Sequence, residues 1–86
     1  MQTDLATLRE RVRELTRASP VAPHVEDVVI ESDWDNEGSD FLRVKIKLFD
    51  SENINVRDLE SLLKNIEDVI GKIDERYPSV RFLDAA

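Results

Sequence analysis

The chain has 86 residues, of which 41% are apolar and 36% are charged, and it carries a formal net charge of −7 with no cysteine. This composition is typical of one small soluble domain over residues 1–86, and it excludes a disulfide framework, a thiolate zinc site and a cysteine nucleophile. The negative charge opposes phosphate backbones, and neither a signal peptide nor a long apolar run is present, so we expect a cytoplasmic protein that binds neither nucleic acid nor membrane.

The first predicted element is an amphipathic helix over about residues 4–18. Apolar residues recur there at helical spacing, at Leu5, Leu8, Val12 and Leu15. Thr3 is the predicted N-cap, because its hydroxyl can accept a hydrogen bond from a free N–H of the first turn. The two prolines of the segment SPVAP, residues 19–23, end this helix.

Two strands are predicted next, over about residues 25–34 and 41–49, and they form an antiparallel hairpin. The predicted inward face comprises Val28, Ile30, Ser32 and Trp34 on the first strand and Leu42, Val44, Ile46 and Leu48 on the second, where basic residues alternate with them. A register that places Trp34 opposite Leu42 aligns these faces. The same register sets Asp33 against Arg43 and Glu31 against Lys45, so the outward charges also match.

A long helix over about residues 56–76 is the strongest local signal. Asn55 is its predicted N-cap. An apolar stripe runs along it, formed by Leu59, Leu62, Leu63, Ile66, Val69, Ile70, Ile73 and Tyr77. Pro78 ends the helix, and a short final strand is predicted over about residues 80–84.

The order of elements, helix-strand-strand-helix-strand, predicts an α+β fold. Both helices are expected on one face of a three-stranded mixed sheet, which makes a two-layer sandwich, a ferredoxin-like plait lacking the first strand. A right-handed crossover places the third strand parallel to the second, either beside it or one place beyond it. This order resembles the cytoplasmic C-terminal domain of cation-efflux transporters, a dimerising plait. Those domains bind metal through histidines, and since His24 is the only histidine here, the resemblance implies no metal site and no cofactor.

The segment DWDNEG, residues 33–38, matches the first half of an EF-hand calcium loop. The second half does not match, because Phe41 and Val44 occupy the ninth and twelfth positions and the flanking segments are strands. Turn chemistry alone accounts for Asp, Asn and Gly at this point of a hairpin. A weak cation- or small-ligand-binding site in the acidic 33–40 loop stays as the alternative, with Asp33, Asp35, Glu37 and Asp40 as ligands.

No pattern in the sequence predicts catalysis. The single histidine, His24, has no neighbouring nucleophile, no serine lies in a GxSxG motif, and two glycines cannot build a phosphate cradle. Basic and aromatic side chains on the second strand suggest RNA stacking, but the acidic residues beside them and the net charge oppose it. We therefore predict that the protein is not an enzyme and does not bind nucleic acid.

The outward face of the sheet is the predicted site of function. It mixes apolar and basic side chains, which is typical of a protein interface. The predicted interface residues are Val29, Phe41, Arg43, Lys45, Lys47, Phe49, Arg81 and Leu83. The sequence thus predicts a non-catalytic protein-interaction or dimerisation module, whose partner is another protein or a second copy of the chain.

Overall fold

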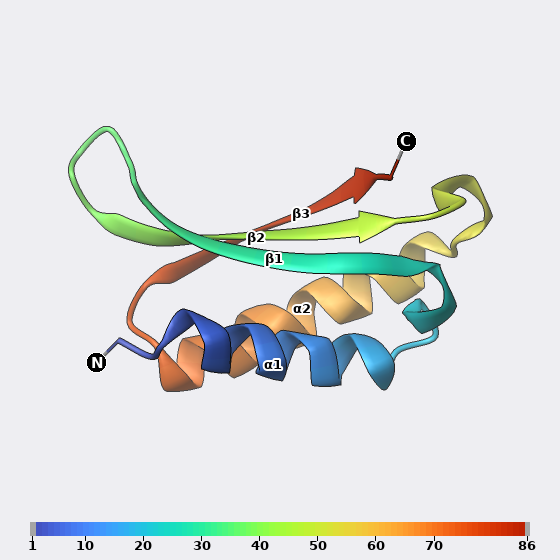
Figure 1. Ribbon diagram of the computed structural model, residues 1–86, viewed down its shortest axis with the longest axis horizontal. Coiled ribbons are helices and arrows are strands. Elements are labelled where there is room, and N and C mark those ends of the chain that lie inside the picture. The colour runs from blue at the N-terminus through green and yellow to red at the C-terminus, as the bar shows by residue number, and fades with distance from the viewer. Residues whose placement is uncertain (1, 86) are drawn as a thin grey trace.

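Two helices and three strands follow one another in the predicted order in the computed structural model, which describes residues 2–85 (Figure 1). The elements are α1 (Leu5–Arg17), β1 (Val25–Trp34), β2 (Asp40–Leu48), α2 (Val56–Ile73) and β3 (Tyr77–Asp84), with short 3-10 turns at Ala22–His24 and Ser51–Asn53. Both helices lie on the same side of the sheet, so the predicted two-layer α+β architecture is confirmed.

The sheet has the strand order β1-β2-β3, with β1 antiparallel to β2 and β3 parallel to β2. Of the two placements that the sequence left open, β3 therefore takes the one directly beside β2. The crossover through α2 leaves no gap between these two strands. Hence the sheet has two free edges, one along β1 and one along β3.

The predicted hairpin register is wrong by two residues. Ser32 lies opposite Leu42 and Trp34 lies opposite Asp40. The reason is that the loop between the strands is shorter than predicted, since the Asp35 N–H donates a hydrogen bond to the Ser39 carbonyl (3.0 Å). Since side chains alternate with a period of two, the shift leaves every residue on its predicted face. Even the predicted charge pairs form, as diagonal contacts between the strands.

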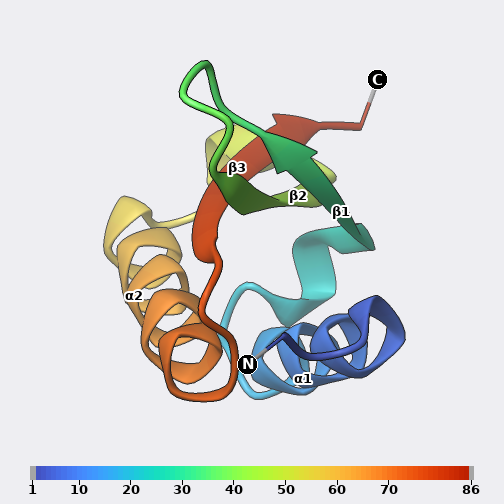
Figure 2. The ribbon, with the colours of Figure 1, turned by 90° about the vertical axis from the view of Figure 1, so that its left-hand side faces the viewer.

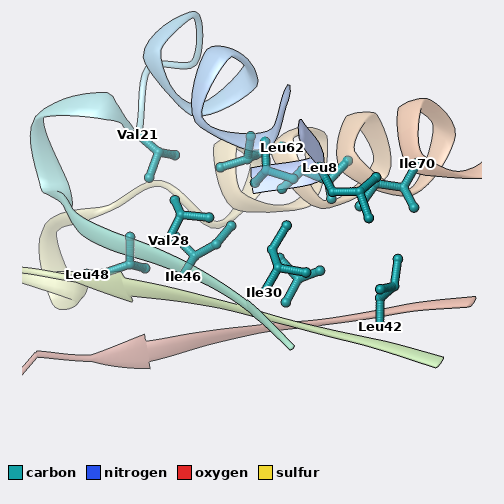
Figure 3. Packing of buried hydrophobic residues seen from close by; sticks show 12 residues of the cluster. Leu8, Val21, Val28, Ile30, Leu42, Ile46, Leu48, Leu62 and Ile70 are labelled. Carbon is teal, nitrogen blue, oxygen red and sulfur yellow. The ribbon is translucent and has the colours of Figure 1, made fainter. Parts of the chain in front are cut away.

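The core lies between the sheet and the two helices (Figure 3). The alternating residues of β2 that face the helices, Leu42, Val44, Ile46 and Leu48, are all buried. They meet Leu8 and Val12 of α1 and Leu62, Ile66 and Ile70 of α2, with Val21, Val28 and Ile30 completing the cluster. This one-sided burial leaves the opposite face of the sheet without a covering layer.

The N-terminal segment is fixed differently from the prediction. Thr3 does not cap α1; Asp4 occupies the N-cap position and makes no side-chain cap. The Thr3 N–H instead donates to the carboxylate of Asp74 (2.7 Å), and its hydroxyl donates to the carbonyl of Ile73. These bonds tie the start of the chain to the end of α2. The predicted Asn55 cap of α2, by contrast, is confirmed, since its side chain accepts from the Arg57 N–H (2.8 Å).

The long helix ends at Ile73 rather than at residue 76, and β3 begins at Tyr77 rather than at residue 80. Asp74 already has an extended backbone, because its carboxylate binds the backbone N–H and the guanidinium of Arg76. Tyr77 is therefore no part of the helical stripe. It lies in β3 and is 66% exposed. Trp34 is also exposed, not inward, since the β1–β2 hairpin projects past the helices (Figure 1).

Candidate interaction surface

The uncovered side of the sheet, called here the outer face, is built from alternate residues of the three strands. Strand pairing aligns them in rows across the sheet, for example Glu31, Arg43 and Ser79 in one row and Val29, Lys45 and Arg81 in the next. The remaining members are Asp27 and Asp33 of β1, Phe41 and Lys47 of β2, and Tyr77 and Leu83 of β3. Seven of the eight predicted interface residues therefore share this face.

The eighth predicted residue, Phe49, lies one position beyond the end of β2. Its side chain is 49% exposed. Its N–H donates to the His24 carbonyl (2.7 Å), and the His24 ring atom Nδ1 lies 3.1 Å from the Phe49 carbonyl oxygen. Phe49 thus sits at the margin of the surface, next to His24 and away from its centre.

The outer face divides into an acidic half and a basic half. On the β1 side, Asp33 pairs with Arg43 (2.8 Å) and Glu31 with Lys45 (3.2 Å). On the β3 side no carboxylate stands beside the strand centre, and Arg81 and Lys47 form no ion pair within residues 2–85. The half of the face formed by β2 and β3 is therefore basic, although the whole chain carries a charge of −7.

Two shallow, open depressions lie side by side over β2 and β3. The first, of about 330 Å³, is lined by Phe41, Arg43, Lys45, Ser79, Arg81 and Leu83. The second, of about 360 Å³, shares Phe41 and Ser79 and extends toward the hairpin loop past Tyr77, Asp35, Ser39 and Asp40. The Arg43 guanidinium lies over the Phe41 ring, 5.5 Å from its centroid, which orders both side chains through a cation–π contact.

Tyr77 is the one residue of this surface that the sequence assigned elsewhere. It lies opposite Phe41 across β2 and β3, and both residues line the second depression on the outer face. The available signal was Pro78, because the residue before a proline is disfavoured in a helix and favours an extended backbone.

The acidic hairpin loop is closed by its own first residue. The Asp35 carboxylate accepts hydrogen bonds from the N–H groups of Glu37 and Ser39 (2.9 Å each), and Gly38 takes a positive φ of 83°. Asp33 is already paired with Arg43. Within residues 2–85 no three His, Cys, Asp or Glu side chains gather closely enough to hold a metal ion. The loop geometry is that of a turn stabilised by an aspartate.

A buried polar cluster that sequence reasoning missed lies on the helix side, behind Ser32. Asp74 and Arg76 form a two-bonded ion pair there (3.0 and 2.8 Å), and Arg76 also donates to the Thr3 carbonyl (2.8 Å). The hydrogen bonds from Arg76 hold the pKa of Asp74 far below its usual value, and those from backbone N–H groups lower it further. All its groups are engaged within the chain, so this cluster is structural.

Comparisons with known proteins give no relative. No protein-family model matches the sequence, and no curated protein or solved structure is significantly similar to it. None of the helices in residues 2–85 combines the length and apolar character needed to cross a bilayer. The function is therefore inferred from the fold and the outer face.

Proposed function

We propose that the protein is a non-catalytic interaction module that binds another protein through the β2–β3 half of its outer face. The observation that carries this proposal is the gathering of Phe41, Tyr77 and Leu83 with Arg43, Lys45 and Arg81 over two adjoining depressions, on the side of the sheet that no helix covers. Exposed aromatic and arginine side chains around a shallow hollow are the usual centre of a protein interface.

The charge of this surface favours an acidic partner. Within residues 2–85 no carboxylate pairs with Arg81 or Lys47, so carboxylates of a partner can pair with them at little desolvation cost near the rim. The same charge disfavours a symmetric face-to-face dimer, since the Arg81 and Lys47 side chains of both copies would be brought onto one interface. We therefore propose that the partner is a different protein rather than a second copy of this chain.

The test is quantitative affinity capture from the native cell lysate, followed by binding measurements with the purified captured protein. Leu83→Asp places a carboxylate in the lining of the first depression, and Val56→Asp is the matched control, because Val56 is exposed on α2 in the helix layer. We expect one protein to bind the wild type and Val56→Asp equally and to bind Leu83→Asp at least tenfold more weakly. Equal binding by all three chains would refute the proposed surface.

A further inference from the structure

The two edges of the sheet differ in how well they close the core. At the middle of the β1 edge the two residues that face the helices are buried, with Val28 1% and Ile30 9% exposed. At the β3 edge the corresponding residues, Val80 and Phe82, remain partly exposed, although Val44 and Ile46 directly opposite them are fully buried. The core is therefore less completely covered at the middle of β3 than at the middle of β1.

The backbone of β3 also offers unused hydrogen-bonding groups. In a parallel pair, alternate residues of a strand bond to the neighbour. The Ala85 N–H donates to the Leu48 carbonyl (2.8 Å), so the odd-numbered residues of β3 bond to β2. The N–H and C=O of Val80 and Phe82 consequently point away from the sheet. No side chain within residues 2–85 donates to them or accepts from them.

The β1 edge is shielded at both of its ends. The Val28 N–H donates to Asp27 (2.8 Å), and the Val28 carbonyl accepts from the Arg9 side chain of α1 (3.0 Å). Near the other end, the Trp34 N–H donates to Asp33 (2.8 Å). Arg9 and Arg13 of α1 further pair with Asp27 (3.6 and 3.5 Å). Side chains that occupy edge groups are a common protection against added strands, and within residues 2–85 β3 has none at Val80 and Phe82, although Pro78 removes one edge N–H near its start.

The helix layer is wider than the sheet. Two packed helices, each about 10 Å across, span about 20 Å, whereas three strands about 4.8 Å apart span only about 15 Å. Figure 2 shows where the difference lies: α1 is beneath β1, while α2 extends outward past β3. A strand added beside β3 would therefore rest on α2 and cover Val80 and Phe82.

We infer that β3 accepts a fourth strand in trans, an extended segment of the protein partner in which apolar and acidic residues alternate. This inference rests on the proposed function and names the way the partner binds. Its apolar side chains would face α2 beside Val80 and Phe82, and its acidic side chains would lie on the outer face beside Arg81. A second copy of β3 fits less well, because it would bring its own Arg81 to the same basic half of the face.

The experiment compares two substitutions at one position. Val80→Pro removes the N–H that points away from the sheet and replaces the valine side chain, and Pro78, two residues earlier in β3, shows that this strand accommodates a proline whose nitrogen lies at the free edge. Val80→Ala also removes the valine side chain but keeps the N–H. The probe is a synthetic peptide of sequence EVEVEVE, with KVKVKVK as the charge control. Binding is measured by fluorescence anisotropy, and hydrogen exchange of the Val80 and Phe82 amides is measured in the wild type with and without peptide.

We expect EVEVEVE to bind the wild type, to slow exchange at both amides, and to bind Val80→Pro at least tenfold more weakly than Val80→Ala, while KVKVKVK does not bind. Absence of EVEVEVE binding at millimolar concentration, unchanged amide exchange, or equal binding by the two variants overturns the inference. Suppose that the captured protein loses affinity for Leu83→Asp and yet binds Val80→Pro and Val80→Ala with equal affinity. In that case the proposed function stands and the inference of a fourth strand is wrong. A dimeric mass in light scattering that Val80→Pro converts to a monomer would make the occupant a second copy, which also overturns it.

Discussion

Asp74 and Arg76 form a buried ion pair that joins the end of α2, the start of β3 and the N-terminal segment. The Asp74 carboxylate accepts from Nε and Nη2 of Arg76 at 3.0 and 2.8 Å, with their side chains 0% and 7% exposed. Through Thr3, the pair also holds the first residues of the chain against Ile73. A buried pair of this kind is costly to break, because the remaining charge stays buried without its counter-ion.

Asp74→Asn should therefore lower the free energy of unfolding by about 3–5 kcal/mol, a large share of what a small domain has. Urea unfolding at neutral pH measures the difference. Asp68→Asn, at an exposed position of α2, is the control and should change stability by less than about 0.5 kcal/mol. Similar effects of the two substitutions would show that the ion pair is not structural.

The same pair predicts how stability depends on pH. Because the pKa of Asp74 is lowered in the folded chain, the unfolded chain binds its proton first as the pH falls. The stabilisation is complete above the ordinary aspartate pKa of about 4 and is lost progressively below it. The wild type should lose stability between pH 4 and pH 2, and Asp74→Asn should show a shallower loss over that range. Parallel pH profiles for the two chains would contradict this role of Asp74.

Gly71→Ala should raise the free energy of unfolding by about 1 kcal/mol, since alanine favours a helix and a Cβ at this position has no neighbour within 4 Å. Thermal or urea unfolding tests it. The matched control is Gly38→Ala, which should destabilise the chain, because the positive φ of 83° at Gly38 strains any residue with a side chain. A destabilising Gly71→Ala would mean that α2 packs against something at this position.

Asp35→Ala should destabilise the hairpin by about 1 kcal/mol, because it leaves the Glu37 and Ser39 N–H groups without their carboxylate acceptor. Glu37→Ala removes the same charge from the loop without this cost and serves as the control. Millimolar calcium should leave the melting temperature of the wild type unchanged. A calcium-dependent rise that Asp35→Ala abolishes would instead support the cation-binding alternative.

The sequence predicts the order, the faces and most boundaries of the elements, since these follow from periodicity and from caps such as Asn55. The register could not be predicted from charge pairing, because Asp33 and Arg43 can form an ion pair both when they are directly opposite and when they are diagonal neighbours. In the structure they are diagonal neighbours. The register follows from the short loop, which is closed by the bond from the Asp35 N–H to the Ser39 carbonyl and by the bonds that the Asp35 carboxylate accepts, and none of these has a periodic signature. The end of α2 depends likewise on the ion pair between Asp74 and Arg76. This pair is held in place by hydrogen bonds to Thr3, which is distant in the sequence, so no local pattern indicates it.

Most of the candidate surface follows from the strict alternation along β2, which fixes Phe41, Arg43, Lys45 and Lys47 on one face. Tyr77 was missed because its spacing continues the helical stripe of α2. The difference between the two sheet edges could not be predicted at all. It depends on Arg9 reaching the Val28 carbonyl and on β3 lying directly beside β2.

Photo-crosslinking in native cells tests most directly whether a protein partner docks over β2 and β3. A photoreactive phenylalanine would replace Ser79, which lines both depressions, or, in a second chain, Lys64 on the exposed side of α2. We predict one specific crosslinked protein from position 79 and none from position 64. Crosslinks from position 64 with none from position 79 would place the partner on the helix layer and contradict the account.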